Sequence, residues 1–144
     1  MRVLNIHPTI FKDFPGVKTV LAVGALDYRL RGLAEGSKER QLLLEELKMS
    51  GENVKILNQI HGDHVISVAA SNHSSFFDKE WPSADGMYTG MPGFYLGVRT
   101  ADCLPILFYN KQAGVVAVVH AGWQGTVQKI VQKAVNAISE EFDW

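Results

Sequence analysis

The sequence is poor in several features, and each shortage excludes a class of protein. It contains a single cysteine, Cys103, so no disulfide forms within the chain, and this composition is typical of reducing compartments. Its 14 Lys and Arg residues are balanced by 15 Asp and Glu residues, whereas a dedicated nucleic-acid binder usually has a basic excess. Apolar runs stay shorter than the roughly 18 residues that span a bilayer. We therefore expect a cytoplasmic protein whose partners include neither nucleic acid nor membrane.

What is present is the patterning of a mixed α/β protein. Apolar residues make up 47% of the 144 residues, which is enough for a core without disulfides. After residue 53, short apolar runs are separated by Gly, Pro, Asn and Asp. These runs predict strands over 54–57, 65–69, 86–89, 94–98, 104–109 and 115–119. The last two runs are continuously apolar, which is typical of strands buried on both faces.

Two further segments have helical periodicity. Residues 37–49 predict a helix that begins at Ser37 and is ended by Gly51. A second helix is predicted from Thr126 to Glu140, with five apolar residues on the face that we expect to pack on the sheet: Val127, Ile130, Val131, Ala134 and Ile138. The first 35 residues indicate only a short strand over 17–23. We predict an α+β or layered α/β fold, with a mixed sheet packed against helices in one domain over 1–144.

Three segments place a metal-capable side chain beside glycine or another small residue near a predicted strand end. They are Asn58-Gln59-Ile60-His61-Gly62, Arg99-Thr100-Ala101-Asp102-Cys103-Leu104-Pro105 and Val119-His120-Ala121-Gly122-Trp123-Gln124-Gly125-Thr126. A Cys/His/His set suits a catalytic zinc, which takes three protein ligands and keeps a fourth position for water. The residues alone leave a plainer alternative open, because a lone cysteine is commonly a small buried hydrophobe.

Together with Ala84-Asp85-Gly86-Met87-Tyr88-Thr89, these segments resemble the diagnostic blocks of the laccase-domain family. That family is also called polyphenol oxidase-like, or purine nucleoside phosphorylase/adenosine deaminase. The likeness runs in order and spacing from about Val54 to Thr126, roughly half of the chain. It implies a layered α/β fold and a zinc ion held by His61, Cys103 and His120. It also implies phosphorolysis of adenosine, inosine, guanosine and methylthioadenosine, and hydrolytic deamination of adenosine.

Other residues are candidates for substrate binding. Gly122 and Gly125 lie between a predicted buried strand and a helix, where backbone N–H groups attract phosphate, the co-substrate of phosphorolysis. The alternative is that these glycines only permit a tight turn. Arg99 is a candidate for binding phosphate or ribose, although an ordinary ion pair would explain it equally well. We expect Trp123 to pack on the sheet rather than to stack on a purine.

The remaining carboxylates and histidines are expected to be structural. Zinc deaminases use a glutamate to carry protons, and no Glu lies in the three segments. Asp102 is the nearest carboxylate in the sequence, but in an extended backbone its side chain would point away from that of Cys103. Asp85 has the same ambiguity, since Asp-Gly is a common turn pair. We expect His64 and His73 at the surface.

The chain departs from the family pattern in ways that leave rivals open. Gln124 stands where relatives commonly have Arg, the N-terminal family block is only loosely matched at Gly24–Arg31, and the chain stops at Trp144, before a Gly-Pro-rich block. We therefore expect the C-terminal portion of the usual family domain to be absent. Five histidines are too few for a blue copper site and a trinuclear cluster, which favours zinc over copper.

Two other functions stay open at this point. One is a hydrolase or deamidase with Cys103 as nucleophile and His120 as its base, which needs only those two side chains in contact. The other is a zinc-binding fragment without activity. The sequence does not indicate an oligomeric state.

Overall fold

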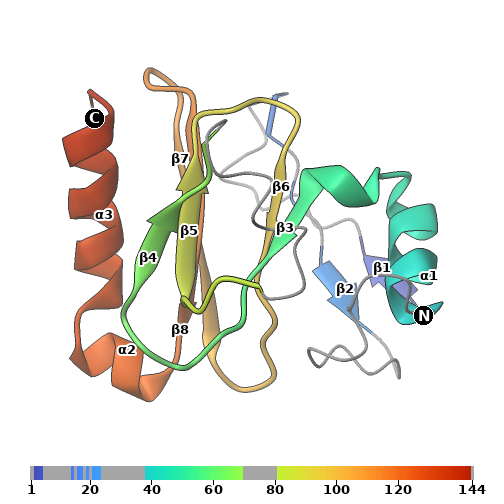
Figure 1. Ribbon diagram of the computed structural model, residues 1–144, viewed down its shortest axis with the longest axis horizontal. Coiled ribbons are helices and arrows are strands. Elements are labelled where there is room, and N and C mark those ends of the chain that lie inside the picture. Colours follow the sequence, from blue (N-terminus) through green and yellow to red (C-terminus); the bar gives the residue numbers. More distant parts are fainter. Residues whose placement is uncertain are drawn as a thin grey trace. The chain divides into compact units, whose positions relative to one another are not determined.

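The structure is a computed structural model that describes residues 2–4, 14, 16–17, 19, 21–23, 38–69 and 81–143 (Figure 1). The chain divides into two compact units, Met1–Gly51 and Glu52–Trp144. The expectation of one domain over 1–144, lacking the C-terminal portion of its family's domain, stays a prediction. Gly24–Arg31, Ser37 and His73 lie outside the described residues.

The first unit contains a strand pair and one helix. Strand β1 (Arg2–Leu4) pairs antiparallel with β2 (Leu21–Val23), and helix α1 spans Lys38–Leu47. The predicted strand and helix of this region are confirmed with shorter bounds, whereas β1 was not predicted. The helix ends at Leu47 because the next residue, Lys48, has a left-handed φ of 53°, and the Met49 N–H then bonds to the Leu44 carbonyl at 3.0 Å. Gly51 is therefore not the residue that ends it.

The second unit is built on a four-stranded mixed sheet with the order β4-β5-β8-β7. Its strands are β4 (Val65–Ser67), β5 (Gly86–Thr89), β7 (Leu104–Asn110) and β8 (Val115–Ala121). Strands β4 and β5 are parallel, and the other neighbours are antiparallel. After the short turn η3 (Gly51–Asn53), β3 (Val54–Ile56) forms a separate parallel pair with β6 (Tyr95–Gly97). The predicted mixed α/β fold is confirmed.

A tight hairpin connects the two longest strands and sets their register. The side-chain Oδ1 of Asn110 accepts hydrogen bonds from the N–H groups of Gln112, at 2.8 Å, and Ala113, at 3.0 Å, and Gly114 supplies a φ of 66°. Leu104 consequently pairs with Ala121 at the other end of the hairpin. This register brings the residue before β7 close to the residue after β8.

The sheet is covered on both faces. Helix α3 (Ile130–Glu141) packs on one face, and the β3–β6 pair lies on the other side (Figure 1). Along β8, Ala117 and Val119 belong to clusters with residues of α3, whereas Val118 packs with Leu57 and Met87 on the opposite face. The prediction that this strand is buried on both faces is confirmed.

The same prediction is wrong for β7. Leu104 is 63% exposed and Leu107 is 39% exposed, and only β8 pairs with this strand. Strand β7 is the edge of the sheet, so one side of its ladder has no neighbour among the described strands. An apolar run indicates a strand but does not indicate whether the strand is central or at an edge.

The C-terminal helix is also interrupted. Helix α2 (Trp123–Val127) ends before Lys129, whose φ of 62° is left-handed, and α3 begins at Ile130. The predicted apolar face is confirmed for Ile130, Ala134 and Ile138, which are fully buried, but Val127 is 73% exposed because the turn at Lys129 changes the helix direction. Among the described residues, no helix is long and apolar enough to cross a membrane.

Candidate metal centre

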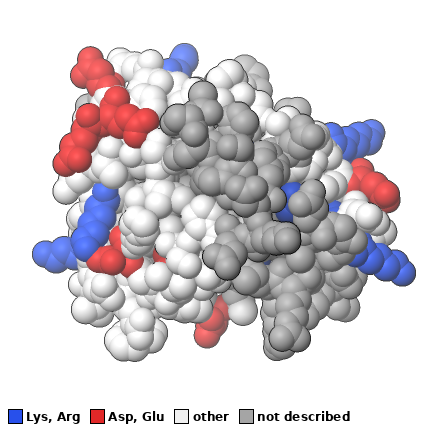
Figure 2. Space-filling view, viewed as in Figure 1, with Lys and Arg blue, Asp and Glu red and all other residues white. Residues whose placement is uncertain are grey.

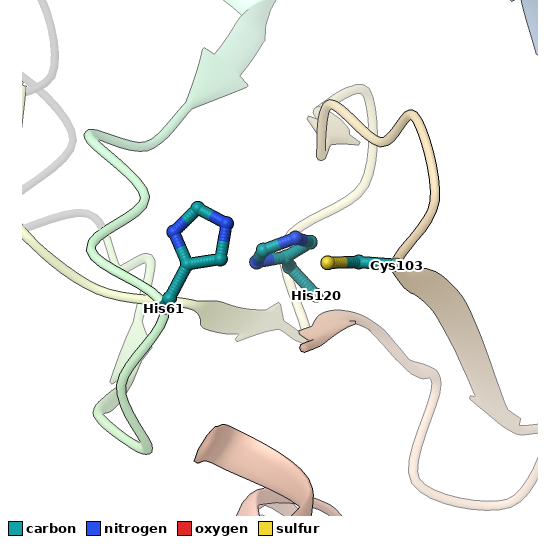
Figure 3. A group of neighbouring side chains, drawn as sticks. All are labelled: His61, Cys103 and His120. Atoms are coloured by element: carbon teal, nitrogen blue, oxygen red, sulfur yellow. The ribbon is translucent and has the colours of Figure 1, made fainter. Parts of the chain in front are cut away.

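The structure brings His61, Cys103 and His120 together near the end of β8. Their ligand atoms all lie within 4.8 Å of one another, and the two imidazole rings meet edge to face at a centroid distance of 4.9 Å. Figure 3 shows the three side chains converging on one space from three separate segments. In the part of the chain that the structure describes, no other three His, Cys, Asp or Glu side chains lie close enough together to share an ion.

Each ligand candidate is positioned by a different element. His120 is buried on β8, opposite Pro105, and Cys103 is half-buried immediately before β7. His61 lies on the loop between β3 and β4, is exposed, and has a left-handed φ of 61°. The hairpin register places the Cys103 segment beside the end of β8, which is why residues far apart in the sequence meet here.

Gly122 lies against all three side chains. A Cβ at this position would be 3.4 Å from both Cys103 Sγ and His61 Cδ2, and 3.8 Å from His120 Cε1. The absence of a side chain therefore leaves the space between the three ligand candidates open. The substrate-binding role predicted for Gly122 stays a prediction.

Asp85 is a site residue that the sequence left ambiguous. Its fully buried carboxylate accepts hydrogen bonds from the backbone N–H groups of Ile60 at 3.2 Å, His61 at 2.9 Å and Gly62 at 2.8 Å. The same carboxylate lies 2.9 Å from Nδ1 of His120, and the His120 N–H donates to the Asp85 carbonyl at 2.7 Å. One aspartate thus connects two of the three ligand candidates.

Asp102 lies closer to the site than expected. The backbone bends at residues 101–103, so the Cys103 thiol donates to Asp102 Oδ1 at 3.6 Å instead of pointing to the opposite face. Partial burial, followed by the charge and hydrogen bond of Asp102, raises the pKa of the Cys103 thiol. This environment favours the protonated thiol.

Arg99 connects the two loops that carry His61 and Cys103. Its guanidinium donates to the Leu57 carbonyl at 2.9 Å and stacks over Trp81 at 5.9 Å. Its backbone N–H and its carbonyl both form hydrogen bonds with the side-chain amide of Gln59, each at 2.8 Å. Burial lowers the pKa of the Arg99 guanidinium. These contacts are structural, and the predicted contact with substrate remains a prediction.

Gly125 permits a close backbone approach. A Cβ at this position would lie only 2.6 Å from the Gly62 carbonyl oxygen, so a larger residue would push α2 away from the His61 loop. This contact supports the tight-packing alternative for Gly125, and its predicted role in phosphate binding stays untested. Asp63, in the same loop, forms a solvent-exposed ion pair with Lys133 of α3, and this contact lowers the pKa of Asp63.

Two further side chains near the site, Trp123 and His64, are both exposed. Trp123 is 75% exposed, so the expectation that it packs on the sheet is wrong: it begins α2, and its side chain projects outward. His64 is exposed, as expected, with Nδ1 3.1 Å from the Ser83 carbonyl oxygen. It does not belong to the group of three.

The donor set fits a zinc ion. A tetrahedral zinc with bonds of about 2.0–2.3 Å holds its ligand atoms roughly 3.3–3.8 Å apart, so the observed separations need a contraction of only about an ångström. Asp85 contacts Nδ1 of His120, which leaves Nε2 for the ion. Metal-binding histidines commonly have such a carboxylate behind them.

The fold and the site together define a class of protein: a mixed α/β protein with a candidate Cys/His/His metal centre. The family described as multi-copper polyphenol oxidoreductase laccase matches residues 34–144. The chain belongs to this family, which confirms the resemblance found in the sequence motifs.

Curated and solved relatives agree with this assignment. The chain is 38% identical over 91 residues to a purine nucleoside phosphorylase of Clostridium acetobutylicum, covering 63% of this chain and 36% of that protein. It is 32% identical over 112 residues to a purine nucleoside phosphorylase of Bacteroides thetaiotaomicron, covering 73% and 40%. The crystal structure of the Bacillus licheniformis hypothetical protein YfiH matches with a TM-score of 0.64 and 28% identity, covering 72% of this chain and 40% of that one. The structure of YlmD from Geobacillus stearothermophilus matches with a TM-score of 0.62 and 34% identity, covering 69% and 38%. The chain spans about two fifths of the length of these relatives.

Proposed function

We propose that this chain carries the zinc centre of a purine nucleoside phosphorylase, with His61, Cys103 and His120 as the metal ligands. The observation that carries this proposal is the convergence of their ligand atoms within 4.8 Å. Zinc is preferred to the copper in the family's description because the five histidines of the sequence are too few for a blue copper site together with a trinuclear cluster. The names of the relatives support purine nucleosides and phosphate as substrates.

A bound zinc supplies Lewis acidity and lowers the pKa of a coordinated water. The chain's own residues supply access and orientation. Exposed His61 and the open space at Gly122 leave the centre accessible from solvent, and exposed Trp123, the next residue, offers an aromatic surface on which a purine base would stack. We assign phosphate to the turn from Gly122 to Gly125, and ribose or phosphate to Arg99.

The same centre is proposed to act on adenosine, inosine, guanosine and methylthioadenosine. Deamination of adenosine additionally requires a group that carries protons. Asp102 is the carboxylate beside Cys103 and is exposed, so it is the residue that we assign to this task. Its hydrogen bond with Cys103 supports this proposal over the structural role that was expected from an extended backbone.

The experiment is incubation of the purified chain with adenosine, with and without phosphate, followed by chromatography and measurement of zinc content. We expect adenine that depends on phosphate, and inosine where deamination occurs. His120→Ala should lose both zinc and activity, because it removes one of the three ligands, and His120 is the buried member of the set. The control His64→Ala should retain both, since His64 lies outside the group. Full activity in a zinc-free His120→Ala protein would refute the proposal.

The hydrolase alternative is supported by one observation: His120 faces Cys103 on one side and Asp85 on the other, which is the order of a Cys-His-Asp triad. The raised pKa of Cys103 disfavours the free thiolate nucleophile that this reaction needs, whereas a zinc ion would itself deprotonate a coordinating thiol. His61→Ala separates the two functions, because a metal centre requires His61 and a dyad does not. Stoichiometric zinc without turnover would instead indicate an inactive zinc-binding fragment.

A further inference from the structure

We infer that Asp85 is the positioning residue of this centre, which fixes the tautomer of His120 and holds the His61 loop in a ligating conformation. This inference rests on the proposed function, because it concerns the same three ligands. It assigns to a single buried carboxylate the arrangement of two side chains that come from different elements.

The surroundings of Asp85 consist of donors. Three consecutive backbone N–H groups, those of Ile60, His61 and Gly62, point at its two oxygens, and the His120 imidazole lies at Oδ1. A fully buried carboxylate is costly unless such donors surround it. Successive backbone N–H groups that converge in this way form a cavity that binds anions. Here the anion is a side chain of the protein itself.

The contact with His120 determines which ring nitrogen is available. A carboxylate offers only acceptors, so Nδ1 of His120 must carry the proton in the 2.9 Å contact with Oδ1. The lone pair of the neutral ring is then on Nε2, on the far side from Asp85. Cys103 and His61 lie close to this ring, and all three ligand atoms lie within 4.8 Å. The tautomer required for metal binding is therefore set before an ion arrives.

The contacts with the loop hold the second ligand. His61 has a φ of 61°, a conformation that residues other than glycine adopt uncommonly. Its N–H and those of its two neighbours all bond to Asp85, so the carboxylate stabilises the backbone conformation from which the His61 side chain extends.

Replacement of Asp85 by Asn shows why a carboxylate is needed. If the amide oxygen takes the place of Oδ2, it serves Ile60 and Gly62, but the NH₂ group then faces the His61 N–H, which loses its acceptor, and His120 Nδ1, whose tautomer is reversed. If the oxygen takes the place of Oδ1, the NH₂ group faces two N–H donors and the loop is disrupted. Neither orientation of an amide reproduces both functions.

The experiment measures zinc affinity by competition with a chelator in the wild-type chain, in Asp85→Asn and in the matched control Asp63→Asn. Loss of a carboxylate behind a metal-binding histidine typically lowers metal affinity about 10- to 100-fold, and we expect that loss for Asp85→Asn. Asp63 lies in the same loop but pairs with Lys133, so its variant should bind zinc within about threefold of wild type.

A second readout is the His120 tautomer, from long-range proton–nitrogen NMR correlations of the chelator-treated protein. We expect the proton on Nδ1 in the wild type. In Asp85→Asn we expect it on Nε2 when the NH₂ group faces His120, a change that a merely structural role would not produce.

The outcomes distinguish this inference from the proposed function. A wild-type chain that binds no zinc overturns the proposed function, whereas the tautomer still tests Asp85. Equal zinc affinity in the wild type and Asp85→Asn overturns the inference. So does a wild-type His120 with its proton on Nε2, and that measurement decides even if Asp85→Asn does not fold.

Discussion

The role of Gly122 follows from the atoms that a side chain at this position would contact. An added Cβ would touch the thiol of Cys103, the ring of His61 and the ring of His120 at ordinary van der Waals distances. Its φ of −76° and ψ of 174° are values that any residue adopts, so glycine is not required by the backbone. The effect of glycine at this position is therefore to leave open the space between the ligand candidates.

A pair of variants tests this interpretation. Gly122→Ala adds only the Cβ, which fits, and should retain zinc. Gly122→Val adds two further methyl groups among the ligand side chains and should lower zinc affinity by about tenfold or more, as other disruptions around metal ligands do. Zinc content after chelator competition measures the effect, with circular dichroism as the control for folding. Wild-type affinity in the valine variant would show that Gly122 only permits the turn.

Single residues also show how far the sequence predicts the site. The three ligand candidates could be singled out because each stands beside a small residue near a strand end, but it was the family resemblance that joined them into one ligand set. The role of Asp85 was not, because an Asp-Gly pair is typical of turns, and only the folded chain shows three N–H donors around a buried carboxylate. The direction of Asp102 was mispredicted because the backbone bends where an extended segment was assumed.

At the scale of elements, the charged side chains of α3 lie at the ends of the helix where its dipole disfavours them. Figure 2 shows acidic side chains gathered over its C-terminal end and basic side chains toward its N-terminal end. The first turn contains no acidic residue and the last turn no basic one. Tertiary contacts explain two of these charges: Lys133 pairs with Asp63, and Glu141 accepts hydrogen bonds from Ser67 and Tyr88. Glu140 is exposed in the last turn, where the dipole disfavours an anion.

We therefore expect Glu140→Lys to stabilise the protein. Reversing this charge at the helix C-terminus should raise the free energy of unfolding by about 0.5–1 kcal/mol at low ionic strength. Glu140→Gln, which only removes the charge, should give about half of the gain. Urea unfolding at low and high salt measures both. A lower stability of Glu140→Lys would mean that a local contact outweighs the dipole.

Elements were predictable where local pattern determines them. The strands after residue 53 were found because turn residues separate them, and β8 was found to be buried because its apolar run is unbroken. The interruption between α2 and α3 was not predictable, because its left-handed residue is Lys129, whereas glycine is the usual signal. The edge position of β7 depends on strand order, which only the fold determines.

At the scale of the second unit, a polar group ties α3 to the sheet. The hydroxyl of Tyr88 on β5 donates to Glu141 of α3 at 2.8 Å, and Ser67 of β4 donates to the same carboxylate at 3.0 Å. Burial, and then the hydrogen bond and charge of Glu141, raise the pKa of Tyr88 to about 12. The neutral phenol is thus favoured by the folded protein.

This shift predicts a loss of stability in strong base. The unfolded tyrosine releases its proton near pH 10, whereas the folded one holds it until about pH 12, so the unfolded state binds fewer protons in that interval. The contribution of Tyr88 is complete below about pH 10 and declines as the pH rises toward 12. The difference in unfolding free energy between wild type and Tyr88→Phe, measured by urea unfolding at several pH values, should shrink across this interval. A constant difference would contradict the shifted pKa.

The length of the β7–β8 hairpin fixes where Cys103 lies relative to the end of β8. Its turn at Asn110 lies seven residues, or about 24 Å, from the end at which Cys103 and Gly122 meet. Adding or removing a single residue in that turn would slip the register and exchange the two faces of one strand. Strand β8 is also paired with β5, so the slip would fall on β7 at the edge of the sheet, and Cys103 would lose its place beside the end of β8. The distant turn, whose residues touch neither a ligand candidate nor its supports in the described contacts, is for this reason under the same length constraint as the centre itself.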